Sequence, residues 1–191
     1  MMALKGVEVI ETPLPKPSSE DYVVARLLEA VVEARLALHF VKEGLVRDAA
    51  GKAFQAWRTV LAALLRLELE RLKAIAKSEE ERRWLEERAV PRVPTSRMIS
   101  LSLMLEQVGY RGVLADTNTA LNIHDYQYHG PDPDMALSRY RTREEAALNI
   151  LFLIGEVARL VEGLKARVKP SAELETALED LKRELRNLAP L

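Results

Sequence analysis

Apolar residues recur at intervals of three and four positions along most of the chain, which is the pattern of amphipathic helices. One such stripe runs from Val24 to Val41 and ends before Gly44. A second stripe begins at Ala49 and extends to about Lys77. Because only a short turn separates the two stripes, the pattern predicts an antiparallel pair of long helices.

Shorter helices are predicted after this hairpin. Ser78 is followed three positions later by Glu81, which is the pattern of a capping box. It predicts a short charged helix that ends before Pro91. Residues 98–108 form the next apolar helix. Residues 112–129 are also expected to be helical, but their apolar positions become sparse toward the end of the segment, where polar and aromatic residues accumulate.

Two more helices are predicted in the C-terminal part of the chain. Thr142 and Glu145 form a second capping box, at the start of the most apolar helix, which extends to Val168. Because this helix is apolar on nearly every side, we expect it to lie at the centre of the molecule. Ser171 caps a last helix whose leucine seam has a period of 3.5 residues: Leu174, Leu178, Leu181, Leu185 and Leu188. We expect this seam to pack on the bundle or on a second copy of the chain.

These elements predict an all-α fold, an up-and-down helical bundle. Residues 1–17 contain three prolines at alternate positions, so this segment is expected to be a short extended N-terminal arm. Residues 18–168 are expected to form the bundle domain. Residues 171–189 are expected to form an amphipathic helix that packs on the bundle or at a dimer interface.

The composition agrees with a helical protein and excludes several kinds of function. The 191 residues are 48% hydrophobic and only 5% aromatic. The 28 Lys and Arg stand against 29 Asp and Glu, so the chain has no overall positive field and we expect no binding of double-stranded DNA. There is no Cys, which excludes disulfides, thiolate zinc sites and Cys nucleophiles.

Two further features concern the environment of the protein. No apolar run is long enough for a signal peptide or a membrane span, so we expect a cytoplasmic protein that does not contact a membrane. Arg is more frequent than Lys, while Asn and Gln are few, which is typical of a thermophilic protein.

The candidate contact surface lies where the helix predicted over residues 112–129 ends and the next one begins. Asp125 precedes His129 by four positions, so on a helix the carboxylate can orient the imidazole, or simply pair with it. No His spacing converges two imidazoles on one ion, so we expect neither a metal nor a cofactor. The candidate ligand-binding residues are His124, Asp125, Tyr128, His129, Arg139, Tyr140, Arg141 and Arg143.

The alternating arginines around Tyr140 allow two explanations. Cations at the start of a helix oppose its dipole, and an anion would relieve this cost. A phosphate of a nucleotide or RNA could bind the arginines and the free amides of the first turn, with Tyr140 stacking on a base. Alternatively, Asp132 and Asp134 form ion pairs with the arginines, and this second explanation is the one that we favour from the sequence.

Unusual stretches of sequence carry a resemblance to a known family. They are Glu43–Trp57, His124–Pro133 and Tyr140–Ala146. Over residues 20–168 the chain resembles the archaeal PaREP proteins, a crenarchaeal paralogous family of uncharacterised function. That family is similar in fold to the HEPN domains, helical bundles that often dimerise, accompany nucleotidyltransferases and in some lineages cleave RNA.

The resemblance does not transfer a catalytic residue. Catalytic HEPN domains carry an Arg and a later His with four to six residues between them. Here only three residues separate Arg35 from His39, although the two share a helix face, and Arg111 is far from His124. The catalytic residues are therefore unknown at this stage, and so is whether the protein is an enzyme.

The leading hypothesis is a non-catalytic binding module, HEPN-like in fold, that forms a homodimer and takes a nucleotide or RNA as its ligand. The first alternative is a metal-independent ribonuclease of a toxin–antitoxin type, which would use His and Arg from the candidate surface or from Arg35 and His39. The second alternative is an accessory partner of a nucleotidyltransferase, without activity of its own.

Overall fold

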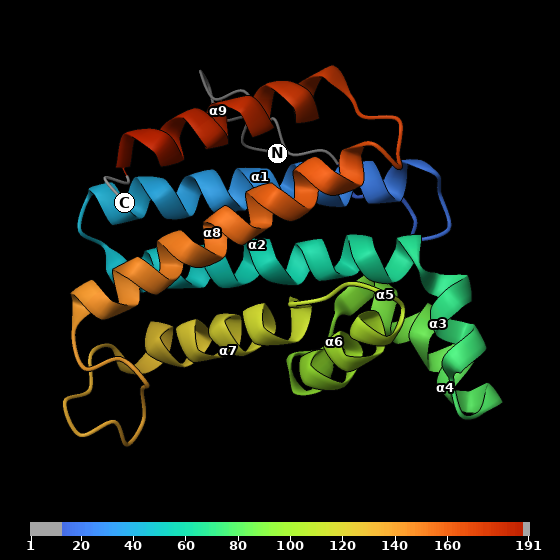
Figure 1. Cartoon of the computed structure of the whole chain (residues 1–191), viewed down its shortest axis with the longest axis horizontal. Coiled ribbons are helices and arrows are strands. Elements are labelled where there is room, and N and C mark those ends of the chain that lie inside the picture. The colour runs from blue at the N-terminus through green and yellow to red at the C-terminus, as the bar shows by residue number, and fades with distance from the viewer. Residues whose placement is uncertain (1–12, 189–191) are drawn as a thin grey trace, which may run out of the picture.

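The structure is a computed structural model in which residues 13–188 are described. Within these residues it is all-α, as predicted, and contains no strand. Its long helices alternate in direction along the chain, which makes the fold an up-and-down bundle (Figure 1). These helices are α1 (Asp21–Lys42), α2 (Val46–Leu67), α7 (Val113–His129), α8 (Arg143–Lys165) and α9 (Ala172–Leu188).

Short elements form a smaller group at one end of the bundle, between α2 and α7 (Figure 1). They are α3 (Leu69–Ile75), α4 (Glu79–Trp84), a π-helical turn over Leu85–Ala89, α5 (Val90–Arg92), a 3₁₀ turn over Thr95–Arg97 and α6 (Met98–Gln107). Ser78 caps α4 by accepting a hydrogen bond from the amide of Glu81, as the sequence predicted.

The second predicted helix does not continue to Lys77, because it breaks at Glu68 between α2 and α3. The Glu68 carboxylate is buried and accepts hydrogen bonds from Tyr110, Arg71 and Arg167. Two of these donors lie 42 and 99 positions away in the sequence. The break is therefore set by tertiary contacts, and the apolar periodicity of α2 gives no sign of it.

The central helix of the bundle is α2, which contradicts the expectation that the most apolar helix, α8, lies at the centre. α2 contacts α1, α7 and α8, whereas α8 crosses over one side of the bundle (Figure 1). The side chains of Leu148 and Phe152 on α8 remain 60% and 53% exposed. The many alanines of α2 and Gly51 explain this arrangement, because small side chains let three helices approach one backbone.

Local signals at the helix starts are confirmed where the structure describes them. Thr142 and Glu145 form the predicted capping box of α8. The amide of Leu174 donates to the Ser171 hydroxyl at the start of α9. Of the predicted N-terminal arm, residues 13–17 are neither helix nor strand, while residues 1–12 lie outside the described part of the chain.

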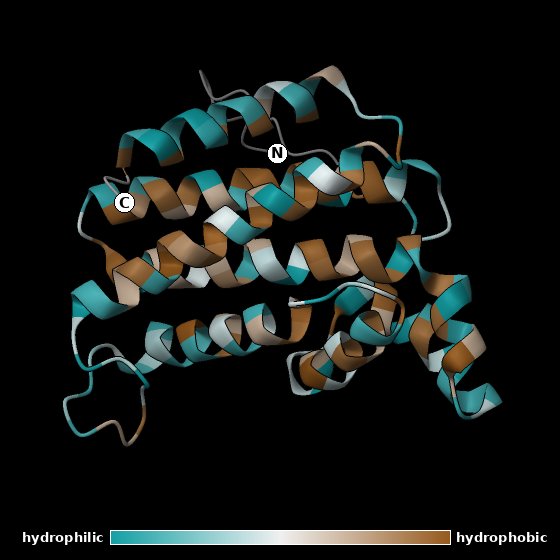
Figure 2. Ribbon diagram, in the orientation of Figure 1, coloured by the Kyte–Doolittle hydropathy of each residue, from teal (hydrophilic) through white to brown (hydrophobic). Residues whose placement is uncertain are grey.

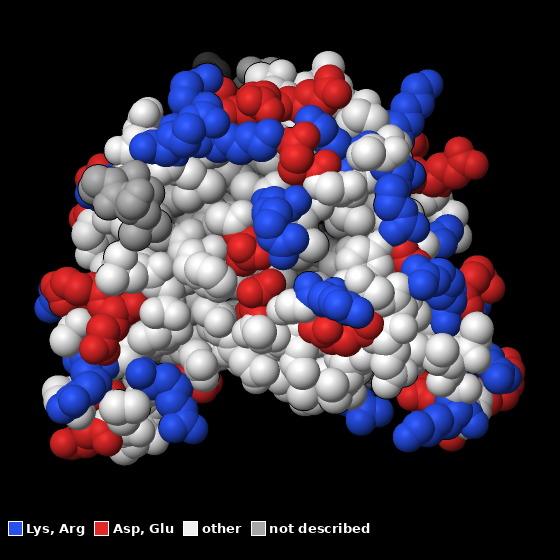
Figure 3. Space-filling view, in the orientation of Figure 1, with Lys and Arg blue, Asp and Glu red and all other residues white. Residues whose placement is uncertain are grey.

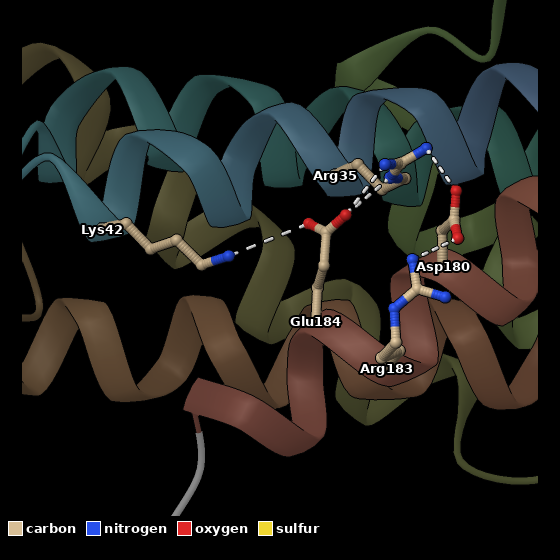
Figure 4. A network of polar contacts seen from close by, with 5 residues as sticks. All are labelled: Arg35, Lys42, Asp180, Arg183 and Glu184. Carbon is tan, nitrogen blue, oxygen red and sulfur yellow. Dashed lines mark hydrogen bonds and ion pairs between the residues drawn. The ribbon is translucent and has the colours of Figure 1, made fainter.

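The C-terminal helix α9 packs on the bundle, against α1 and α8. Three leucines of its seam are buried, and the face of the helix turned away from the bundle is hydrophilic (Figure 2). Ion pairs reinforce the contact with α1: Arg35 bonds Glu184 at 2.8 Å and Asp180 at 3.4 Å, and Lys42 approaches Glu184 (Figure 4). None of the described helices is both long and apolar enough to traverse a lipid bilayer.

Candidate functional site

The α1–α2 turn and the end of α7 meet at one end of the bundle, which brings two of the unusual sequence stretches together. Gly44 in the turn and Gly130 after α7 both have positive φ, at 74° and 69°, which lets the chain reverse tightly at both places. Arg47 joins the two segments, because its guanidinium donates to the carbonyl oxygens of Gln127 at 2.9 Å and Tyr128 at 2.7 Å.

A pocket of about 280 Å³ opens at this junction, and we call it the end pocket. It is lined by residues 44–48, Tyr126, Pro131 and Arg143. These residues come from the α1–α2 turn and the first turn of α2, from α7, from the loop after α7, and from the start of α8. Four separate segments therefore build one small concave surface.

The start of α2 supplies hydrogen-bond donors to the end pocket. The first amides of an α-helix have no acceptor within the helix, and they carry the positive end of its dipole. Leu45 precedes α2, and its apolar side chain cannot cap these amides. Arg47 and Arg143 add two guanidiniums against the one carboxylate of Asp48, so the pocket has a net positive charge.

Tyr126 provides the most specific group of the end pocket. Its side chain is only 1% exposed, and its ring packs edge-on against Tyr140 with centroids 5.8 Å apart. Within residues 13–188 its hydroxyl makes no hydrogen bond to another residue, and this oxygen is not among the fully buried polar atoms that lack a partner. Burial raises the pKa of Tyr126, and the nearby Arg143 and Arg47 lower it in part.

The predicted arginine row is free of ion pairs, which contradicts the explanation that the sequence favoured. Arg139, Arg141 and Arg143 are exposed, and no carboxylate in the described part of the chain lies within ion-pair distance of them. The Asp132 carboxylate instead accepts hydrogen bonds from backbone amides of its own loop: Asp134, Leu137 and Ser138. Figure 3 shows basic and acidic side chains side by side on this protruding loop, at the lower left.

Tyr140 has a structural role that differs from the predicted one. Its side chain is 6% exposed and packs against Tyr126, and burial raises its pKa to about 12. In this arrangement the ring is almost completely buried, so it offers little surface on which a ligand base could stack. Tyr140 instead holds Tyr126 in place beneath the end pocket, so it supports the site without lining it.

The remaining predicted residues lie along the last turns of α7 and do not form the expected pair. Asp125 and His129 are both exposed, and no ion pair joins them within the described residues. His124 stacks on Phe54 at 4.0 Å, with Tyr128 edge-on to it at 5.2 Å. Burial lowers the pKa of His124, and its Nδ1 has no partner in the described structure, so this imidazole is neutral at pH 7. Tyr128 is exposed beside it.

Sequence reasoning found Arg143 but missed Arg47 and Tyr126. A signal for Arg47 was present, since it stands at the second position of α2 and opposes the helix dipole as Arg143 does on α8. No signal could have found Tyr126, because three tyrosines lie close together in this part of the chain. Only the tertiary structure shows which of these tyrosines lines the pocket.

The alternative pair, Arg35 and His39, lines a separate shallow cavity of about 350 Å³ together with Glu184. The Arg35 guanidinium is held by two carboxylates of α9, so it is not available to a substrate in this arrangement (Figure 4). Within residues 13–188, no cluster of three or more His, Asp or Glu side chains has a geometry that could hold a metal ion.

Comparisons with known proteins place the chain in one family. No curated protein and no solved structure matches the chain. The sequence profile of the archaeal PaREP1/PaREP8 family matches residues 25–151, which is more than half of the chain. The matched region contains both segments that meet at the end pocket, the start of α2 and the end of α7. The chain therefore belongs to the archaeal PaREP1/PaREP8 family.

Proposed function

We propose that the protein is a non-catalytic binding module, HEPN-like in fold, that takes a phosphate group of a nucleotide or RNA in the end pocket. The observation that carries this proposal is that Arg47, Arg143 and Tyr126 line one pocket, in which Arg143 has no ion pair within the described structure. The guanidiniums and the phenol hydroxyl are all hydrogen-bond donors, so a ligand rich in oxygen atoms can accept from each of them.

The chemistry of the pocket is suited to a phosphate. Guanidiniums form strong charge-assisted hydrogen bonds with phosphate oxygens, and a helix start offers amide donors to the same oxygens. Arg143 supplies a charge without an intrachain ion pair among residues 13–188. Arg47 contributes its charge while its hydrogen bonds to the carbonyls of Gln127 and Tyr128 fix its position. Such a fixed donor loses little entropy when a ligand binds.

The surroundings favour a nucleotide over free phosphate. Tyr128, whose carbonyl accepts a hydrogen bond from Arg47, exposes its ring to solvent. An exposed aromatic ring next to a phosphate site is the arrangement on which a base stacks. Arg139 and Arg141 precede Arg143 on the same segment and extend the positive surface outward from the pocket.

The test compares variants that remove one donor each. Binding of ATP and of a labelled 12-nucleotide single-stranded RNA is measured for the wild type, Arg143→Gln and Tyr126→Phe. Tyr126→Phe removes only the hydroxyl and keeps the ring that packs on Tyr140. We expect each substitution to weaken binding by about tenfold, the effect of one hydrogen bond to a charged group.

The matched control is Arg83→Gln, which removes an exposed arginine of α4 that lines none of the pockets described above. It is expected to change the affinity by less than about twofold, in line with a long-range charge effect alone. If Arg143→Gln and Tyr126→Phe behave like this control, or if the wild type binds neither probe, the proposal is wrong.

The same RNA also tests whether the module is catalytic. The ribonuclease alternative requires an available Arg and His, but Arg35 is engaged by α9 and His124 is partly buried against Phe54. We therefore expect the labelled RNA to remain intact during incubation with the wild type. Cleavage that is lost in His39→Ala or His129→Ala would establish the ribonuclease instead.

Self-association is proposed for the outer face of α8. Leu148 and Phe152 lie one helical turn apart, and both are more than half exposed. Large apolar side chains in such a position are typical of an interface, and a symmetric homodimer is the commonest form of association. Light scattering at micromolar concentration should give the mass of a dimer for the wild type and of a monomer for Phe152→Ser. A monomeric wild type would reject the homodimer.

A further inference from the structure

A second positively charged pocket lies where α1, α2 and α5 meet, and we call it the side pocket. It has a volume of about 260 Å³ and contains the side chains of Arg26, Arg58 and Arg92 together with Glu29 and Thr59. None of these residues belongs to the candidate surface that the sequence indicated, and none of them lines the end pocket. Three guanidiniums against one carboxylate give the side pocket a net positive charge.

Two of the three guanidiniums are available to a ligand. Arg26 is engaged, since it bonds Glu29 at 2.7 Å, the Tyr22 hydroxyl at 3.0 Å and the carbonyl of Pro91 at 3.1 Å. Arg58 and Arg92 have no carboxylate partner within the described residues. Arg58 lies over the ring of Phe54, at 6.0 Å from its centroid, which orients this side chain without neutralising it.

Thr59 adds a hydroxyl group to the lining of the side pocket. Its side chain lines the pocket and is only 5% exposed. Within residues 13–188 the hydroxyl makes no hydrogen bond, whereas Thr119 on α7 donates to the carbonyl one turn earlier, as helical threonines commonly do. A hydroxyl in the lining of a cationic pocket is a hydrogen-bond donor for an oxygen-rich ligand.

The wall of the side pocket is held in a strained conformation. Val93 has φ of 42° and ψ of 72°, a left-handed conformation that is unfavourable for a β-branched residue. The segment before it is fixed by hydrogen bonds from α1, because the Tyr22 hydroxyl donates to the carbonyl of Val90 and Arg26 donates to that of Pro91. Strain of this kind is concentrated at ligand sites, where it fixes a geometry before binding.

A continuous series of contacts connects the side pocket to the end pocket. Arg58 and His124 both lie against the buried ring of Phe54, and the exposed Tyr128 is edge-on to His124. The carbonyl of Tyr128 accepts a hydrogen bond from Arg47 in the end pocket. Cationic groups therefore stand at both ends of this path, and the ring of Tyr128 between them is exposed to a base of a single-stranded nucleic acid.

The distance between the two pockets indicates the length of the ligand. Arg47 and Arg58 are eleven residues apart on α2, which corresponds to about 16 Å along the helix axis. The adjacent phosphates of one nucleotide cannot reach both pockets, whereas phosphates several nucleotides apart on one strand can.

We propose that the side pocket is a second phosphate-binding site and that the ligand of the protein is a single-stranded RNA segment that spans both pockets. The inference rests on the proposed function of the end pocket and extends it. In this arrangement Arg58, Arg92 and the Thr59 hydroxyl hold one phosphate group, while Arg143, Arg47 and Tyr126 hold another several nucleotides away. Tyr128 lies between them and stacks on a base.

The experiment measures binding of single-stranded RNAs of 2 and 12 nucleotides by fluorescence anisotropy. The wild type is expected to bind the longer RNA at least tenfold more tightly. The double variant Arg58→Gln/Arg92→Gln should weaken binding of the 12-nucleotide RNA about tenfold or more, and Thr59→Val should weaken it to a smaller extent. The dependence of log K on log salt should become less steep by about 0.7, because one phosphate contact is lost.

Two comparisons make the result decisive. Arg83→Gln, the exposed control, should leave binding of the 12-nucleotide RNA within twofold of the wild type. Two results would contradict the proposal that the side pocket binds a phosphate group. They are equal affinity of the wild type for both RNAs, and an effect of Arg58→Gln/Arg92→Gln no larger than that of the control. If Arg143→Gln and Tyr126→Phe still weaken binding in that case, only the second site fails. If they do not, the proposed function fails as well.

Discussion

Arg35 and Arg143 stand in two regions of the bundle that use the same side chain in opposite ways. At the α1–α9 contact, the Arg35 guanidinium meets two carboxylates and joins two helices. At the end pocket, Arg143 meets no carboxylate in the described structure and lines the same pocket as Tyr126. Both residues are arginines on helices with acidic neighbours in the sequence. An ion pair between two helices therefore distinguishes an arginine that stabilises the fold from one that is available to a ligand.

Two buried carboxylates, Glu68 and Asp116, differ in the same way. Substitutions of these two residues are expected to have the largest effects on the free energy of unfolding. Glu68 is buried with three donors around it, whereas Asp116 on α7 is buried without a hydrogen bond to its carboxylate in the part of the chain described. Burial alone raises the pKa of Glu68, but the hydrogen bonds from Tyr110, Arg167 and Arg71 outweigh it and hold this pKa below its ordinary value. For Asp116, burial and the nearby Glu156 raise the pKa to about 6.

Glu68→Gln is expected to lower the free energy of unfolding by about 2 to 4 kcal/mol, because it leaves buried donors and Arg167 without their charged partner. Urea denaturation at pH 7 measures this loss. Because the pKa of Glu68 is lowered in the folded state, its stabilisation is complete above the ordinary pKa of Glu and is lost as the pH falls through the folded-state value. Glu70→Gln, a control on the exposed side of α3, should change stability by less than about 0.5 kcal/mol. A loss below about 1 kcal/mol for Glu68→Gln would contradict this account.

Asp116→Asn is expected to have the opposite effect to Glu68→Gln, raising the free energy of unfolding at pH 7 by about 1 to 3 kcal/mol. The folded-state pKa of Asp116 is raised, so its protonated form favours folding at low pH and this contribution disappears as the pH rises through about 6. His124, whose pKa is lowered, acts in the opposite direction over the same range, so the quantity to measure is the difference between variant and wild type from pH 4 to 8. That difference should grow toward pH 7.

Asp125→Asn is the matched control for Asp116→Asn, because it removes an exposed carboxylate from the same helix. Its stability should follow the wild type at every pH. Destabilisation by Asp116→Asn at pH 7 would show that the Asp116 carboxylate has a compensating partner in solution.

Arg35→Gln is expected to destabilise the protein by less than about 1 kcal/mol, since the ion pairs between α1 and α9 are partly exposed. The effect should shrink in 1 M NaCl, because salt screens such pairs. Thermal unfolding at low and high salt measures both quantities. An effect that is equally large in 1 M NaCl would indicate that the aliphatic part of Arg35, and not its charge, holds α9.

Arg143→Gln is expected to have the smallest effect on stability, a gain of a few tenths of a kcal/mol at most. The substitution removes a cation from the positive end of the α8 dipole and breaks no ion pair within the described structure. Measured beside Arg35→Gln by the same thermal unfolding, it separates the two kinds of arginine directly. A loss above about 1 kcal/mol would mean that Arg143 serves the fold and not a ligand.

Much of the fold could be predicted from the sequence, because helix signals are local. The capping box at Thr142, the turn at Gly44 and the serine cap before α9 act within four residues, and the structure confirms them. The break at Glu68 could not be predicted, since it depends on donors far away in the sequence. The central place of α2 was also missed. Composition indicates how apolar a helix is, but the space that small side chains leave for neighbouring helices depends on how the helices meet.

The candidate site was predictable only in part. The arginine row before α8 was found because charged residues at a helix start are visible in a sequence. Whether Arg143 is paired depends on where Asp132 points, and Asp132 is occupied by the amides of its own loop. The roles of Tyr126 and Tyr140 were not predictable, because both tyrosines are buried and only one of them lines the pocket.

The amino-acid sequence alone determined that this protein is an all-α bundle of the archaeal PaREP1/PaREP8 family, where most of its helices begin and end, and which segments are rich in arginine. The tertiary structure alone decided which arginines are neutralised, which hydroxyls lack a partner among residues 13–188, and that the start of α2 meets the end of α7. The physical reason is the separation in sequence over which each effect acts. Periodicity and capping act between residues that are close together along the chain. Pairing and burial depend on residues that folding brings together from distant positions.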